Sequence, residues 1–277
     1  MPAETRPKTA VPHGTCDCHM HVYDPAYPLA PTAIAPPPPG PLRDYLRVRA
    51  RLGIARTVVV QPTAYGADNS CTLAAIDAMG ASARGVAMVT GDEPDGELER
   101  LSLSGIRGFR FRAFPGGVLP WEKLDRMAAR GQEFDWFMDI EMDGRTLPGH
   151  DAQIARLPGK LIIDHIGKFL DPVPVDHPGV AVLMRLVESG RTYVKIASPY
   201  DSSRSGPPKY DDLAPLVALL VRKAPDRLIW ASNWPHAALA VEQRPDDAAW
   251  LDLMTDWMDE TTRRKMLVDN PATLFGF

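Results

Sequence analysis

The feature that most constrains the fold is a regular alternation of short apolar runs with helical patterns, from about residue 15 to the C-terminus. Parallel strands need a crossover between them, usually a helix, so this alternation is typical of a parallel sheet. We predict strands at Thr15–Tyr23, Thr57–Gln61, Gly85–Thr90, Gly108–Phe111, Trp136–Met142, Leu161–His165, Tyr193–Ala197 and Leu228–Ala231. We predict helices at Leu42–Leu52, Ser70–Met79, Pro120–Arg130, Val180–Ser189, Asp211–Lys223 and Pro245–Met266.

Eight such units predict an α/β fold, a closed (β/α)8 TIM-type barrel, as a single domain over residues 15–277. A doubly wound open sheet is the alternative. It is disfavoured because no G-x-G-x-x-G motif follows the first predicted strand. Residues 1–14 lack the apolar core of a secretory signal, and we expect them to form a flexible N-terminal arm.

Charge and cysteine content limit the partners and the compartment. The formal net charge is −4, which gives nucleic acid no overall attraction. No apolar run reaches the roughly 18 residues that a membrane span needs. The three cysteines, Cys16, Cys18 and Cys71, are too few for a disulfide framework, so we expect reduced thiols and a cytoplasmic protein. A homodimer is considered only because symmetric oligomers of that kind are common.

A proline-rich segment follows the first predicted strand. Residues 25–41 end in Pro-Pro-Pro-Pro-Gly and cannot form a helix or a central strand. Because the segment directly follows a barrel strand, we expect a loop that overhangs the barrel mouth.

Histidines mark the ends of two predicted strands. In Cys16-Asp-Cys-His-Met-His-Val22, side chains alternate between faces, so Asp17, His19 and His21 are expected inside the barrel. Cys16 and Cys18 are then expected toward the helices. His165 closes the sixth strand, where barrel enzymes carry their chemistry. We therefore expect His19, His21 and His165 to be catalytic.

Charged side chains on the fourth and fifth strands also face inward. Alternation places Arg110 and Arg112 together, opposite Asp139, Glu141 and Asp143. Buried guanidinium groups are costly unless they meet an anion, and arginine binds carboxylates with two hydrogen bonds. We expect some pairing with these carboxylates and at least one arginine free for an anionic substrate. Further candidates for substrate binding are Gln61, Tyr65, Lys195, Tyr200 and Arg204, and Asn233 closes the last strand.

These motifs resemble the amidohydrolase superfamily. The resemblance is closest to the branch that holds 2-pyrone-4,6-dicarboxylate lactonase, sugar-acid lactonases and galactarolactone isomerase. It is carried by the motifs Asp17-Cys-His-Met-His, Gln61-Pro-Thr-Ala-Tyr, Asp164-His-Ile-Gly-Lys168, Ala231-Ser-Asn-Trp-Pro-His236 and the C-terminal Asn270-Pro-Ala-Thr-Leu-Phe. It implies that His19, His21 and His165 surround a reacting carbonyl, and that Arg110 binds a substrate carboxylate. In metal-bearing relatives the same histidines hold a divalent ion.

The chain departs from that pattern at the last strand, where Asn233 replaces an Asp that activates water. A neutral amide cannot take a proton from water and is a poor metal ligand. Three explanations stay open: an engineered Asp→Asn variant, a natural subgroup with another base such as Glu141, or a reaction that needs no activated water. The chain also lacks an Arg near Gly116-Gly117 and a Tyr in residues 31–36, which disfavours the pyrone dicarboxylate.

The resemblance therefore implies a hydrolase that opens a small carboxylated lactone, with no cofactor. The alternatives are a lactone isomerase, a hydrolase or decarboxylase with Zn or Mn on His19, His21 and His165, and a non-catalytic barrel that binds carboxylates.

Overall fold

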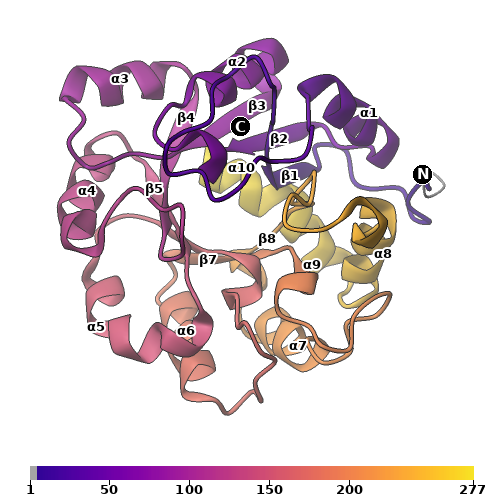
Figure 1. The fold of residues 1–277 in the computed structure, drawn as a ribbon. Helices are drawn as coiled ribbons and strands as arrows, with labels where there is room; N and C mark the ends of the chain where they lie inside the picture. Colours follow the sequence, from indigo (N-terminus) through magenta and orange to yellow (C-terminus); the bar gives the residue numbers. More distant parts are fainter. Residues whose placement is uncertain (1–4) are drawn as a thin grey trace.

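A computed structural model describes residues 5–277, and it confirms the (β/α)8 barrel (Figure 1). Eight parallel strands form one sheet in sequence order. They are β1 (Cys16–Met20), β2 (Arg56–Val60), β3 (Ala83–Ala87), β4 (Ile106–Arg112), β5 (Phe137–Glu141), β6 (Leu161–Ile163), β7 (Thr192–Ile196) and β8 (Leu228–Trp230). All eight overlap a predicted strand.

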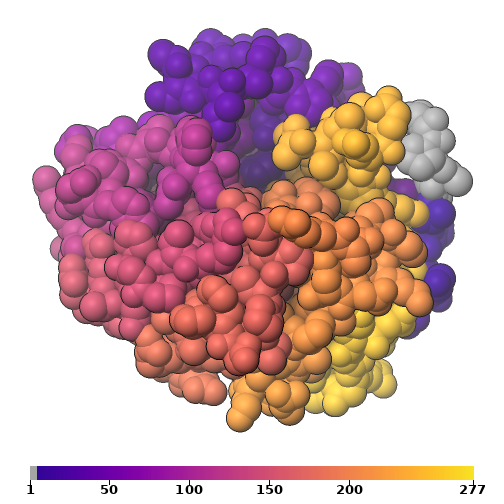
Figure 2. All heavy atoms as spheres, turned by 60° about the horizontal axis from the view of Figure 1, so that its bottom comes forward, coloured from indigo at the N-terminus to yellow at the C-terminus, as the bar shows by residue number. Residues whose placement is uncertain are grey.

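A ring of helices surrounds the strands (Figure 1). The helices are α1 (Leu42–Leu52), α2 (Ser70–Met79), α3 (Asp95–Leu103), α4 (Trp121–Glu133), α5 (Leu147–Arg156), α6 (Pro178–Glu188), α7 (Ala214–Lys223), α8 (Asp247–Asp256), α9 (Glu260–Arg264) and α10 (Asn270–Phe275). Helices α3, α5 and α10 were not predicted, and the single helix predicted at Pro245–Met266 is divided into α8 and α9. Figure 2 shows the same circular order from outside, because the colours pass around the molecule in sequence order.

The strands bury side chains on both faces, as a parallel barrel requires. One buried cluster holds Val58, Ile162 and Ile229 and fills the barrel interior. Helix α10 closes the bottom of this cluster, where the rings of Phe275 and Phe137 lie 5.2 Å apart. The alternate strand residues, such as Val59, pack against the helices.

The barrel closes between β1 and the segment after β8. The backbone N–H of Asn233 donates to the His19 carbonyl at 2.9 Å, and that of His21 donates to the Trp234 carbonyl at 2.8 Å. A parallel bridge pairs Met20 with Trp234. These bonds place the end of β1 directly beside Asn233.

The predicted faces of β1 were wrong at its start. Between the pairs Asp17–Thr57 and Met20–Val59, β1 advances three residues while β2 advances two. This extra residue is a β-bulge, which shifts the alternation of faces. Cys16 and Cys18 therefore lie in the interior cluster, whereas the Asp17 carboxylate accepts a hydrogen bond from Tyr45 of α1. His19 and His21 still reach the interior side, because the bulge lies before them.

The described part of the predicted N-terminal arm lies against the barrel. The backbone N–H of Lys8 donates to Asp252 of α8 at 2.9 Å. The segment's flexibility stays a prediction, and residues 1–4 lie outside the described part. Among residues 5–277, no helix combines the length and the apolar character that crossing a membrane demands.

Candidate active site

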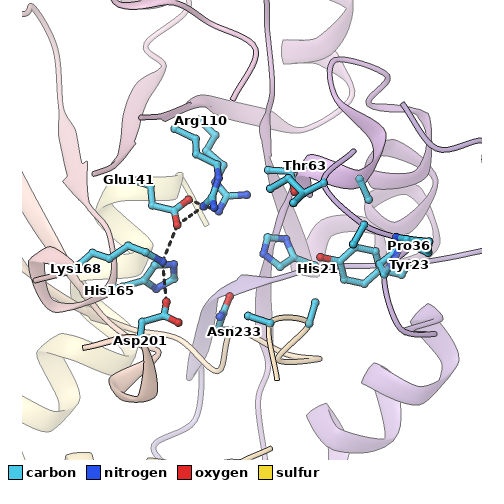
Figure 3. Close-up of a pocket in the computed structure, with 17 residues that line it drawn as sticks. His21, Tyr23, Pro36, Thr63, Arg110, Glu141, His165, Lys168, Asp201 and Asn233 are labelled. Carbon is cyan, nitrogen blue, oxygen red and sulfur yellow. Dashed lines mark hydrogen bonds and ion pairs between the residues drawn. The ribbon is translucent and has the colours of Figure 1, made fainter. Parts of the chain in front are cut away.

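A cavity of about 320 Å³ opens at the C-terminal ends of the strands. Its lining includes His21, Tyr23, Pro36, Thr63, Arg110, Arg112, Glu141, His165, Lys168, Asp201 and Asn233 (Figure 3). Ile34 to Pro37 of the proline-rich segment line it too, so that segment does lie at the barrel mouth. The position at the strand ends is the one that barrel enzymes use.

His19 and His21 form a hydrogen-bonded chain that starts at Lys195. The Nζ of Lys195 donates to His19 Nδ1 at 2.9 Å, and the two histidine Nε2 atoms lie 3.1 Å apart. His21 Nδ1 must donate to the Val60 carbonyl, 2.8 Å away, because a carbonyl only accepts. Burial lowers the pKa of His21 to about 3 and that of His19 well below its usual value. Both imidazoles are therefore neutral, and His19 Nε2 carries the proton shared with His21.

A buried lysine cluster lies below the cavity and consists of Lys195, Asp139, Asp164 and His19. Lys195 is fully buried, and its Nζ lies 2.6 Å from each of the two carboxylates. Burial, and then the charge of Asp164, raises the pKa of Asp139 to about 7. Burial alone would also raise the pKa of Asp164, but Lys195 and the neighbouring histidines hold it well below its usual value. The predicted substrate ligand Lys195 is thus paired internally and does not line the cavity.

A second group, the cationic cluster, lines the cavity itself and consists of Arg110, Arg112, Lys168, Glu141 and Asp201. Glu141 accepts from Arg110 at 2.6 Å, pairs with Arg112, and lies 2.8 Å from Lys168 Nζ. Lys168 also contacts Asp201 at 2.7 Å (Figure 3). Three cations and two carboxylates leave one net positive charge. The predicted pairing with carboxylates is present, but the predicted free arginine is not: Arg110 and Arg112 both pair with Glu141, and the excess positive charge belongs to the cluster as a whole.

The carboxylate of Glu141 is a weak proton acceptor in this setting. Burial favours its neutral form, but the charges of Arg110, Lys168 and Arg112 together hold its pKa well below the usual range. An ionised carboxylate with three cationic partners orients those partners. This environment argues against the general-base role that the sequence left open for Glu141.

His165 lies on a strained turn directly after β6. Its φ is +50°, and Ile166 and Lys168 also have positive φ. Such conformations are rare for side chains other than glycine, and they occur often at functional sites. Burial lowers the pKa of His165 to about 4, so the imidazole is neutral at neutral pH. Its Nδ1 has no hydrogen-bond partner among the described residues.

Asn233 ends a hydrogen-bonded chain that comes from α8. Its Nδ2 donates to the Tyr200 hydroxyl at 2.8 Å, which lies 3.1 Å from His236 Nδ1. His236 Nε2 lies 3.0 Å from Asp247. In Figure 3 the amide oxygen of Asn233 points toward the space between His21 and His165. Tyr200 was predicted to touch substrate, and it instead lies behind Asn233.

Other predicted site residues lie outside the cavity lining. Gln61 donates to the carbonyls of Gly66 and Asp68, and the Tyr65 hydroxyl donates to that of Asp24. Arg204 is largely exposed and pairs with Asp171. Asp143 was expected to face inward beside Glu141, but β5 has ended there, and Asp143 pairs with Arg145.

The predictions omitted four residues that the structure brings to the site: Lys168, Asp201, Asp164 and Tyr23. Lys168 and Asp164 belong to the quoted Asp164–Lys168 motif, so a signal existed for both. Asp201 lies in an irregular turn after β7, where no periodicity tells which way a side chain points.

The residues present fit a divalent metal ion poorly. His19, Asp164 and His165 each offer a ligand atom, all within 4.8 Å of one another. Lys195 already places a positive charge against both His19 and Asp164, and its hydrogen bond keeps the proton of His19 on Nε2. A metal ligand must be deprotonated, and Asn233 offers no carboxylate.

Comparisons with known proteins identify the family of the chain. The family model described as amidohydrolase matches residues 16–277. The D-galactarolactone isomerase of Agrobacterium fabrum is 35% identical over 98% of this chain and 94% of its own length. A 4-sulfomuconolactone hydrolase of Rhizobium radiobacter is 36% identical over 96% of this chain and 91% of its own.

Solved structures show the same relationship. An apo crystal structure from Agrobacterium tumefaciens has a TM-score of 0.92 at 35% identity and covers 98% of each chain. A putative 2-pyrone-4,6-dicarboxylic acid hydrolase from Pseudomonas putida has a TM-score of 0.82 at 26% identity, covering 96% of this chain and 98% of its own. The predicted resemblance is thus confirmed, and the chain belongs to the amidohydrolase family.

Proposed function

We propose that this protein hydrolyses a small carboxylated lactone by attack at the lactone carbonyl, without a metal ion. The observation that carries the proposal is the net positive charge of the cationic cluster beside two neutral imidazoles. Relatives over nearly the whole chain are named for lactones, which supports the substrate class.

The cationic cluster is the binding element for the substrate carboxylate. Arg112 and Lys168 keep partial contact with the cavity, and Arg110 is held by Glu141 and by the Gln61 carbonyl at 3.1 Å. Guanidinium groups fixed in this way bind a carboxylate with little loss of side-chain freedom. Glu141 keeps the three cations together.

His165 is the proton carrier in this proposal. A water molecule attacks the carbonyl carbon and gives one proton to the neutral imidazole. The ring C–O bond then breaks, and the same proton passes to the departing ring oxygen. Cationic donors beside the carbonyl stabilise the oxyanion, which is commonly the largest catalytic contribution.

The test is turnover of sugar-acid 1,4- and 1,5-lactones and unsaturated dicarboxylate lactones, followed by NMR, with His165→Asn as the variant. Asparagine tolerates the positive φ of this position. We expect hydrolysis by the parent chain and a loss of at least about 100-fold in the variant, with the fold intact by circular dichroism. A lactone that raises the melting temperature without being consumed would instead identify a carboxylate-binding barrel.

Isomerisation is the second candidate, and Asn233 favours it. With an amide where a base is expected, a hydroxyl of the substrate itself can attack the carbonyl and form a different lactone. Turnover in ¹⁸O-labelled water separates the two reactions. Hydrolysis places ¹⁸O in the new carboxylate, whereas internal transfer yields an unlabelled lactone.

The metal-free part of the proposal has its own test. We expect chelator treatment to leave activity unchanged, with less than about 0.1 metal ion per chain by elemental analysis. Activity that disappears with the chelator and returns with Zn²⁺ or Mn²⁺ would contradict it.

A further inference from the structure

A buried hydrogen-bonded chain links α8 to the cavity through Asp247, His236, Tyr200 and Asn233. The distances between successive partners are 3.0, 3.1 and 2.8 Å. Asp247 and His236 are 5% and 3% exposed, so water does not compete for these bonds. Only Asn233 at the end of the chain is a cavity-lining residue.

The donors and acceptors give the chain one direction. His236 Nε2 must donate to the Asp247 carboxylate, and Asn233 Nδ2 donates to the Tyr200 oxygen, so the hydrogen of the Tyr200 hydroxyl is left for His236 Nδ1. The Tyr200 hydroxyl therefore donates to His236 and uses its oxygen to accept from Asn233 Nδ2. The amide nitrogen is thereby fixed toward Tyr200, which leaves the amide oxygen toward the cavity (Figure 3).

We infer that Asp247, His236 and Tyr200 are positioning residues that fix Asn233 as a hydrogen-bond acceptor for the water molecule that attacks the lactone carbonyl. This inference rests on the proposed function and assigns the orientation of the nucleophile to a particular amide. One hydrogen of the water is donated to the Asn233 oxygen and the other faces His165, so an acceptor of fixed direction selects which lone pair of the water faces the carbonyl carbon. His165 remains the group that takes the proton.

The same chain explains why an amide suits position 233. An Asp carboxylate there would have no hydrogen to donate to Tyr200. That carboxylate and His236 Nδ1 would then both need the one proton of the Tyr200 hydroxyl. Asn233 removes this conflict, because its Nδ2 supplies the missing hydrogen. The surrounding residues therefore accommodate an asparagine at position 233 with every hydrogen bond of the chain formed.

The test is a double-variant cycle on Tyr200 and Asn233. Tyr200→Phe keeps the ring and removes the hydroxyl, which frees the amide to rotate. We expect kcat to fall about 10–100-fold with KM within about two-fold. Asn233→Ala is expected to lower kcat to a similar extent, and Tyr200→Phe is expected to cost less than about two-fold in that background. His236→Asn, which suits the positive φ there, is expected to behave like Tyr200→Phe.

Tyr210→Phe is the matched control, since Tyr210 is also buried, packs against Trp250 of α8 and lies outside the chain. It is expected to leave kcat and KM unchanged. Equal losses from Tyr200→Phe with and without Asn233 would overturn the inference.

A second readout needs no turnover. The ¹⁵N NMR shifts of His236 are expected to show a proton on Nε2 and none on Nδ1. A proton on Nδ1 would overturn the inference by reversing the chain. If no lactone is consumed, the proposed function fails while this measurement still decides the direction of the chain.

Discussion

Two ion clusters lie one above the other in the barrel, and they differ in exposure and in charge balance. The lower one is the buried lysine cluster around Lys195, which is sealed from solvent and has one cation for two carboxylates. The upper one is the cationic cluster around Glu141, which borders the cavity and has three cations for two carboxylates.

The comparison separates the cluster that stabilises the fold from the cluster that binds substrate. In the lower cluster every charge already has an internal partner, so an incoming anion has nothing to meet. In the upper cluster one positive charge is uncompensated, so a substrate carboxylate completes it. Charged side chains inside one barrel thus either stabilise the fold or bind substrate. The ratio of cations to carboxylates in each cluster tells which.

The largest expected effect comes from breaking the sealed cluster. Lys195→Met leaves Asp139 and Asp164 buried without a cation, and we expect a loss of about 3–5 kcal/mol in the free energy of unfolding. Urea denaturation measures it. Adding Asp139→Asn and Asp164→Asn to the same chain is expected to restore much of the loss. A loss below about 1 kcal/mol would show that the lower cluster gives no support.

Removing a cation from the upper cluster is expected to affect binding more than folding. For Arg110→Met we expect kcat/KM for the lactone to fall about 100-fold or more, mainly through KM. Arg107→Met is the control on the same strand, because the Arg107 guanidinium donates to the backbone carbonyls of Ser102 and Ile106 at the other end of β4. Equal kcat/KM values for Arg110→Met and Arg107→Met would contradict a role of the upper cluster in substrate binding.

A third experiment uses pH to probe the neutral histidine between the clusters. The folded pKa of His165, about 4, lies below its ordinary 6.5, so the unfolded chain takes up the proton first as pH falls. The stability from this group is complete above pH 6.5 and is lost as pH falls toward 4. His165→Asn is expected to remove this pH-dependent contribution, roughly 3 kcal/mol across the window. Parallel stability curves for parent and variant would show that the histidine is not held neutral.

The smallest effect is expected at the rim. Arg204 pairs with Asp171 in solvent, and exposed pairs contribute at most about 1 kcal/mol. We expect Arg204→Ala to change KM less than two-fold, whereas Arg112→Ala at the cavity raises it more. A larger effect for Arg204→Ala would bring the loop after β7 into substrate binding.

The strands could be predicted because each is buried on both faces and is therefore mostly apolar, with charged residues such as Arg110 and Lys195 as exceptions inside the barrel. Their faces could be predicted where alternation is unbroken, as for Arg110 and Glu141. The prediction of faces failed at the start of β1, because a single extra residue reverses the alternation of inward and outward side chains. Residue types do not mark such a bulge. Helix α5 was missed because Pro148 and Gly149 obscure its pattern.

The site was predictable on the regular strands and directly after their ends, as for His165 and Asn233. Lys168, Asp201 and His236 lie in turns, and Lys168 and His236 have positive φ, so no periodicity fixes their directions. The chain from Asp247 to Asn233 joins residues that only the folded barrel brings together. Residue types alone gave no sign that Tyr200 lies behind an amide.

The seam between β1 and Trp234 also bears on how the molecule is made. His19 and Asn233 meet there although 213 residues separate them along the chain, as the backbone bond between them shows. Contacts of such long sequence separation form slowly, because a large loop must close first. A ribosome-bound chain that has not released β8 therefore has an open edge on β1, and it has no catalytic cavity. Synthesis has to pass residue 234 before the enzyme can bind its substrate.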